Sequence, residues 1–184
     1  DLAGDSTMTK FLFNGEFIKK ITINNVKVLF FFLFAIQKMI TILTFGSITK
    51  HFIPSIEEYK KRLWTKVKRE NKNIKYNSAE EEKKGNSQLL QQQIAKRYSN
   101  DEIYILDIEW KQYSSKSFTK HFIAQSCNIL FCIWGAHWFE KRVVSYYETI
   151  SLWKQTMPHT LILIILQEQI YRWYQILHWK KYHY

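Results

Sequence analysis

Residues that cross-link or interrupt a chain are scarce in this sequence. Its 184 residues include only two cysteines, two prolines and five glycines. The cysteines, Cys127 and Cys132, are too few for the disulfide framework of a small secreted domain, so a reducing compartment is expected. A glycine-rich phosphate loop, a G-x-S-x-G elbow, an H-E-x-x-H pair and paired CxxC motifs are also missing. We therefore predict a protein that is not an enzyme, with no cofactor and no catalytic, cofactor-binding or metal-binding residue.

Acidic residues are the minority among the charged ones. The chain has 16 Asp and Glu against 27 Lys and Arg, a net charge of +11 and a pI of about 9.5. This excess favours an anionic partner, which can be nucleic acid, an acidic lipid surface or an acidic protein subunit. The abundance of Ile, Lys, Phe, Tyr and Asn is typical of AT-rich coding and indicates an organellar or otherwise AT-rich genome.

The longest apolar stretch, residues 28–48, is long enough to cross a membrane as a helix. Its sequence is VLFFFLFAIQKMITILTFGSI, with a mean hydropathy of roughly 2, in the range of membrane helices. A hydrocarbon core about 30 Å thick needs about 20 such residues. We predict a helix here, which either spans a membrane or is fully buried in a globular core. The alternative is a segment that folds partly as strands. The residues assigned to the membrane anchor are Val28, Phe32, Ile36, Ile40 and Leu43.

Polar residues near the middle of this stretch share one side of the predicted helix. They are Gln37, Lys38, Thr41 and Thr44. Because a lysine at the centre of a bilayer costs about 2.5–3.5 kcal/mol on insertion scales, this polar stripe is expected to face protein. Upstream, Asn14-Gly15 lies between apolar runs, which predicts a short N-terminal β-hairpin.

A basic helix is predicted directly after the apolar stretch, over residues 56–69. Ser55 and Glu58 form an S-x-x-E capping box, and apolar residues then recur at helical spacing. Such a charged face is either solvated, in contact with phosphates, or bound to anionic lipid. The basic surface consists of Lys60, Lys61, Arg62, Lys66, Lys68 and Arg69.

The rest of the chain also favours helices. Residues 71–86 are polar and predict a loop, and a helix is predicted from Ser87; residues 103–110 alternate and predict a strand. Residues 121–139, 143–155 and 159–179 predict a buried helix and two further helices. The expected fold is mainly α, with one transmembrane or buried helix and several amphipathic helices. Four segments are expected: 1–27, 28–48, 49–102 and 103–184.

Metal chemistry is the third functional alternative. Glu109 begins an E-x-K pattern after the predicted strand, with Asp101 and Asp107 upstream, as in metal-dependent nucleases. The same pattern arises easily by chance in a lysine-rich chain. Cys127, Cys132 and His137 would point in different directions on one helix, so a shared metal is not expected.

The leading hypothesis is a non-catalytic accessory or structural subunit of an organellar membrane complex. Its partners would be other protein subunits and anionic lipid, in the mitochondrial inner membrane or a plastid membrane. The alternative is a basic, RNA-associated or ribosomal accessory protein of an organelle, binding RNA through its basic helix and its aromatic C-terminal residues.

Overall fold

The chain folds around a parallel β-sheet. The computed structural model describes residues 38–63, 67–108, 112–123, 125 and 127–177. The hairpin predicted at Asn14-Gly15 and the first part of the apolar stretch lie outside these residues. All pairings in the sheet are parallel, and the strand order is β2-β1-β4-β3-β5. The strands are β1 (Ile40–Phe45), β2 (Val67–Lys72), β3 (Glu102–Leu106), β4 (Ile129–Ile133) and β5 (Glu148–Ile150).

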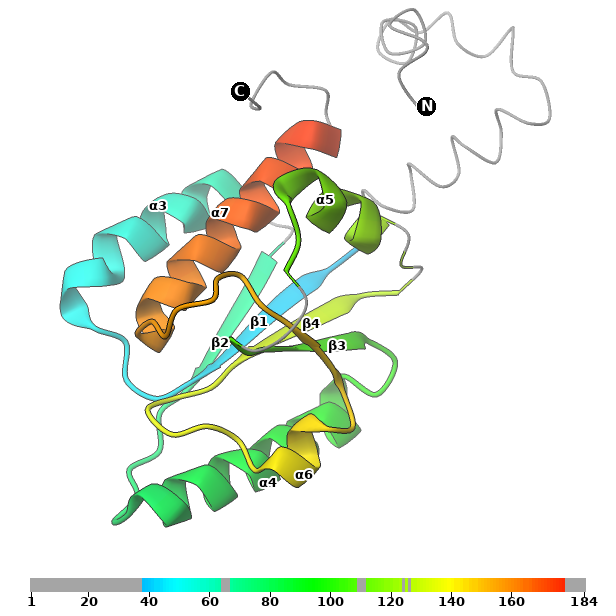
Figure 1. Cartoon of the computed structure of the whole chain (residues 1–184). Helices are drawn as coiled ribbons and strands as arrows, with labels where there is room; N and C mark the ends of the chain where they lie inside the picture. The colour runs from blue at the N-terminus through cyan, green and yellow to red at the C-terminus, as the bar shows by residue number, and fades with distance from the viewer. Residues whose placement is uncertain (1–37, 64–66, 109–111, 124, 126, 178–184) are drawn as a thin grey trace, which may run out of the picture.

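Helices cover both faces of the sheet (Figure 1). One face carries α3 (Ile53–Leu63), preceded by a short 3-10 turn (Lys50–Phe52), together with α5 (Ser115–Ile123) and α7 (His159–Leu177). The other face carries α4 (Ala79–Arg97) and α6 (Lys141–Val144). The β1–β2 and β3–β4 connections move one way across the sheet over the first face. The β2–β3 and β4–β5 connections move the opposite way over the second face, so all four share one hand.

The prediction of a mainly α fold is wrong, because the most apolar segments are central strands. Residues 40–45 form β1 instead of the second half of a helix, and every residue of β1 and β4 is buried. A parallel strand with helices on both faces loses the alternation of polar and apolar residues. Its sequence then resembles a buried helix, and residues 28–39 made the run long enough to suggest a membrane span.

Other predicted helices are divided or shifted. The helix predicted over 56–69 ends at Leu63, and Val67 begins edge strand β2, paired with Ile40 of β1. Residues 121–139 contain the end of α5, strand β4 and a loop, and residues 143–155 contain the end of α6 and β5. The loop predicted over 71–86 includes the start of α4, which Ser78 caps. The final helix, α7, lies within the predicted range of 159–179.

The structure gives no support to a membrane span in the described part of the chain. Among the described residues, no helix is both long and apolar enough to cross a membrane. Three members of the predicted polar stripe, Lys38, Thr41 and Thr44, are among the described residues, and all three are buried inside the fold. Lys38 donates a hydrogen bond to the Phe122 carbonyl oxygen (2.8 Å), and Thr44 Oγ1 lies 2.9 Å from Asn71 Oδ1 on the neighbouring strand. These polar groups therefore join elements within the fold.

The parallel arrangement brings the carboxyl ends of all strands to one edge of the sheet. The loops that follow β3, β4 and β5 meet there, close to the start of α7. Gly46, directly after β1, has a φ of 92°, a conformation that favours glycine. In open α/β sheets ligands bind at this edge, so it is where a functional site is expected.

Candidate functional site

The carboxyl edge of the sheet holds a small apolar cavity beside a larger groove. The cavity has a volume of about 20 Å³ and the groove about 1040 Å³, and both are lined by Asp107 and Ile108, which follow β3. The cavity is otherwise lined by Leu106, Trp134, Leu152, Trp153, Gln155, Met157, Ile162 and Ile165. The groove lies between α4 and α6, and its further lining includes Glu80, Lys83, His137, Trp138, Lys141, Tyr147 and Glu148.

The loops after β3 and β5 are tied to each other. The Asp107 backbone N–H donates to the Ile150 carbonyl oxygen at 2.9 Å. The Ser151 hydroxyl is buried and lies 2.8 Å from the Trp153 carbonyl oxygen and 3.3 Å from that of Ile108. These bonds hold the two loops against each other, so the walls of the cavity are fixed by backbone contacts.

The loop after β4 is anchored to α4 and to β1. The Ala136 N–H donates to Glu82 Oε1 at 3.2 Å. Gly135 has little room for a side chain, because a Cβ there would lie 3.2 Å from the Phe45 carbonyl oxygen and would displace Glu82 Oε1, which would be 2.9 Å away. Glycine at 135 therefore allows the loop to approach β1 and to carry Trp134 into the cavity.

Two tryptophans of this loop form the boundary between the cavity and the groove. Trp134 lines the cavity and is 5 % exposed, whereas Trp138 lines the groove and is 37 % exposed. Their ring centroids are 4.7 Å apart, with an angle of 35° between the ring planes. Such a pair is stabilised by about 0.5–1.5 kcal/mol beyond the burial of its area. The orientation of Trp138 therefore depends on Trp134.

The fold and this edge define the class of protein to which the chain belongs. It is an α/β protein with a candidate ligand site, built from the loops at the carboxyl ends of parallel strands. The groove is as large as typical pockets for organic ligands, which range over about 300–1,000 Å³. Its lining combines aromatic rings with both carboxylates and amines, which suits a ligand that has a planar ring and charged groups.

Comparison with known proteins identifies the family. The family model described as "Predicted SPOUT methyltransferase" matches residues 39–183, so the chain belongs to the SPOUT methyltransferase family. It is 34 % identical over 145 residues to ribosomal RNA large subunit methyltransferase H of Mycoplasmopsis synoviae, covering 78 % of this chain and 98 % of that protein. Proteins of the same name from Caldicellulosiruptor bescii (36 % over 157 residues; 79 % and 99 % covered) and Enterococcus faecalis (31 % over 157 residues; 78 % and 98 % covered) are similar too.

Family membership corrects the functional predictions. The chain is an enzyme, so the hypothesis of a non-catalytic accessory subunit is wrong. The prediction of an organellar membrane protein is also wrong, because the relatives are bacterial methyltransferases and no described helix could span a membrane. Protein subunits and anionic lipid have no support as partners. RNA, the alternative partner, fits the family.

The predicted site residues do not form one surface. Lys60, Lys61 and Arg62 are exposed on α3, whereas Lys68 and Arg69 lie on β2 and Lys66 is outside the described residues. Arg69 is partly buried and lies 3.3 Å from the Ile56 carbonyl oxygen, and burial lowers its pKa. Among the predicted anchor residues, Ile40 and Leu43 are fully buried in β1, and the other three lie outside the described residues.

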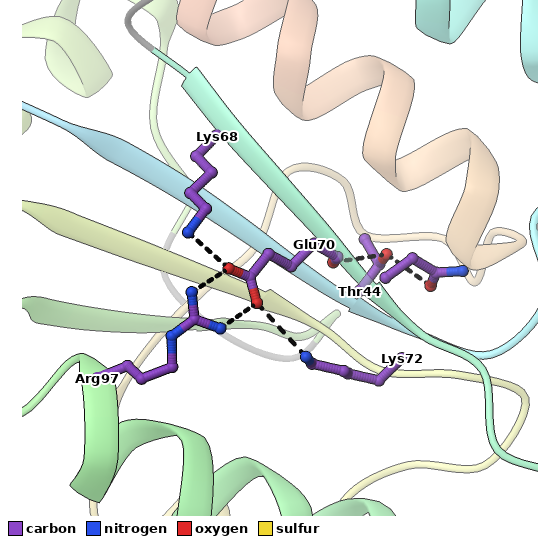
Figure 2. A network of polar contacts seen from close by, with 6 residues as sticks. Thr44, Lys68, Glu70, Lys72 and Arg97 are labelled. Carbon is purple, nitrogen blue, oxygen red and sulfur yellow. Dashed lines mark hydrogen bonds and ion pairs between the residues drawn. The ribbon is translucent and has the colours of Figure 1, made fainter.

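Glu70 on β2 forms ion pairs with three basic side chains, of which only Lys68 belongs to the predicted basic surface (Figure 2). Its carboxylate lies 2.8 Å from Lys68 Nζ, 3.5 Å from Lys72 Nζ and 2.7 Å from an Arg97 guanidinium nitrogen. Burial by itself would raise the pKa of Glu70, but the hydrogen bonds from Lys68 and Arg97 help to lower it to about 2. This network joins β2 to the end of α4, so Lys68 has a structural role here.

The residues of the carboxyl edge that follow β4 and β5 were missed because residues 121–139 and 143–155 were predicted to be helices. The turn Trp134-Gly135-Ala136 lay inside the helix predicted over 121–139. Of the acidic residues considered for a nuclease, Asp101 and Asp107 lie at opposite ends of β3, too far apart in the strand to share a metal, and Glu109 is outside the described residues. A glycine after a run of β-branched and aromatic residues was the available signal for a strand end.

Proposed function

We propose that this chain transfers a methyl group to ribosomal RNA of the large subunit, the reaction that the names of its relatives describe. Support comes first from the match to the methyltransferase model over residues 39–183 and from the coverage of 98–99 % of the relatives' own length. The observation that carries the proposal is the pair of adjoining hollows at the carboxyl edge. A methyltransferase must hold a donor and an acceptor side by side, and these hollows share Asp107 and Ile108.

The donor site is assigned to the small apolar cavity and the loops around it. S-adenosylmethionine, the general biological methyl donor, supplies an electrophilic methyl group on a sulfonium when it is bound. The lining fits its chemistry, since aliphatic side chains such as Leu106 and Leu152 suit an adenine ring and Gln155 offers an amide. A volume of about 20 Å³ is too small for the ring. Trp153, which is 56 % exposed, can rotate outward to admit it with little loss of packing.

The acceptor is assigned to RNA on the basis of charge as well as family. A net charge of +11 gives a long-range attraction to a phosphate backbone. Lys60, Lys61 and Arg62 on the exposed side of α3 remain proposed phosphate contacts. Glu57 and Glu58 pair with Lys60 and Arg62, but exposed pairs of this kind are weak and exchange readily with other anions.

Methyl transfer can be measured directly. The purified chain is incubated with S-adenosylmethionine carrying a tritiated methyl group and with ribosomal subunits from cells that lack the gene. Label should enter large-subunit RNA, while small-subunit RNA serves as the matched control. If label enters neither RNA although the chain binds the donor in calorimetry, the proposal is contradicted.

A further inference from the structure

We propose that the groove between α4 and α6 receives the target nucleotide of the RNA, with its base stacked on Trp138. This inference rests on the proposed function and assigns the acceptor site within it. The groove is the larger of the hollows at the carboxyl edge, at about 1040 Å³, and has room for a nucleotide. It reaches the donor cavity at Asp107 and Ile108, so a base in the groove lies next to the methyl group that is to be transferred.

Trp138 has the exposure and the support that a stacking platform needs. One side of the ring packs on Trp134 at a centroid distance of 4.7 Å, and 37 % of the residue remains exposed. Because Trp134 is almost fully buried, it holds Trp138 in place and reduces the entropy lost when a base binds. A base on Trp138 adds a third ring to the tilted aromatic pair that begins at the donor cavity.

Charged groups around the groove match the two ends of a nucleotide. Lys83 on α4 and Lys141 on α6 are amines on opposite walls that can bind flanking phosphates. Asp107 is a carboxylate that can accept hydrogen bonds from the N–H groups of a base, and Glu148, whose Oε1 also lies 3.5 Å from His121 Nε2, has a second oxygen that can do so. Since carboxylates and amines are both present, the groove suits an extruded nucleotide better than a continuous phosphate backbone.

A second groove, between α3 and β2, is a weaker candidate for the base. It has a volume of about 490 Å³ and is lined by residues that include Ile53, Lys60, Arg69 and Glu70. No aromatic ring is among its lining residues, and it shares no residue with the donor cavity. A base held there would have neither a stacking partner nor access to the methyl group.

Binding of RNA in the absence of donor tests the inference. The probe is a fluorescein-labelled, single-stranded RNA of ten nucleotides, titrated with the full chain and followed by anisotropy. Trp138→Ala should raise the Kd about ten-fold, since stacking on an aromatic side chain is worth this much per base. Trp138→Phe retains a ring and should stay within about three-fold of the wild type. Tyr146→Ala removes an aromatic that is 77 % exposed and does not line the groove, and it should change the Kd less than about two-fold.

The outcomes separate this inference from the proposed function. If Trp138→Ala binds the RNA as tightly as the wild type, or if Tyr146→Ala loses as much affinity, the groove is not the nucleotide site. Failure of the wild type to bind the probe at all also overturns the inference. Thermal unfolding of each variant shows that the fold is retained. Calorimetry with S-adenosylmethionine measures donor binding, and the tritium assay measures methyl transfer. A wild type that binds RNA through Trp138 yet transfers no methyl group therefore contradicts only the proposed function.

Discussion

Glu70 is the residue through which an edge strand is joined to the helix layer on one face of the sheet. Its side chain is only 12 % exposed, and it is bound on three sides by Lys68, Lys72 and Arg97. The two terminal guanidinium nitrogens of Arg97 donate to its carboxylate oxygens, at 2.7 and 2.9 Å. Bidentate pairs of this kind are stronger than ordinary surface ion pairs, so Glu70 is expected to contribute measurably to stability.

Replacement of Glu70 by Gln should destabilise the chain in a pH-dependent way. The folded pKa of about 2 lies below the usual 4.5, so the charged carboxylate stabilises the fold above pH 4.5, and this contribution is lost as the pH falls from 4.5 to 2. At pH 7 the free energy of unfolding should drop by about 1–3 kcal/mol. Urea unfolding at pH 7, 4 and 3 should show the difference shrinking; a difference that stays constant with pH would exclude this role.

At the scale of elements, α4 forms one wall of the proposed nucleotide groove and also anchors the loop after β4. Its first turn begins after Ser78, whose hydroxyl accepts a hydrogen bond from the Glu81 N–H at 3.1 Å. The start of α4 also provides Glu80 and Lys83 to the groove, and Glu82, which accepts a hydrogen bond from the Ala136 N–H. The capping residue therefore stabilises the part of α4 that positions the site.

Loss of this cap should have a modest and localised effect. Ser78→Ala should lower the free energy of unfolding by about 1 kcal/mol, because an N–H in the first turn loses its acceptor. Ser78→Asn, which can cap in the same way, should stay near the wild type. Hydrogen exchange of the amides at 79–83 should accelerate in the alanine variant. Equal losses in both variants would show that Ser78 stabilises the fold through another contact.

At the scale of the whole molecule, one sheet unites segments that are far apart in the sequence. Strands β1 and β2 lie on one side of β4, and β3 and β5 lie on the other. The excess of basic residues is not concentrated on one element, since α3, β2, α4 and α6 all carry lysine or arginine. Attraction to RNA is therefore expected to be a property of the whole surface, with recognition confined to the carboxyl edge.

The affinity for RNA should consequently depend strongly on salt. Each phosphate neutralised by Lys or Arg releases counterions, so raising the salt from 50 to 200 mM should weaken binding of the RNA decamer by about ten-fold or more. Binding of S-adenosylmethionine, measured in parallel, should change much less because its site is lined mainly by apolar groups. An RNA affinity that is independent of salt would refute an electrostatic mode of binding.

The parts of the fold and of the site that could be predicted are those whose sequence pattern lies within a single helix or strand. The helix that became α7 was foreseen from Pro158 and the helical spacing after it, and residues 103–110 signalled the strand β3. Both patterns lie within one element. Trp134, Asp107 and Leu152 could not be grouped from the sequence, because only the pairing of β3 with β4 and β5 brings them together.

The sequence by itself determined the charge, the quantity of apolar residues, and the elements with a clear local period. Tertiary structure decided what the most apolar segments became. Ile40–Phe45 and Ile129–Ile133 are strands because each pairs with a neighbour on both sides and is covered by helices on both faces. A segment buried in this way has no polar side to mark its period, so only the hydrogen bonds to distant strands distinguish it from a helix.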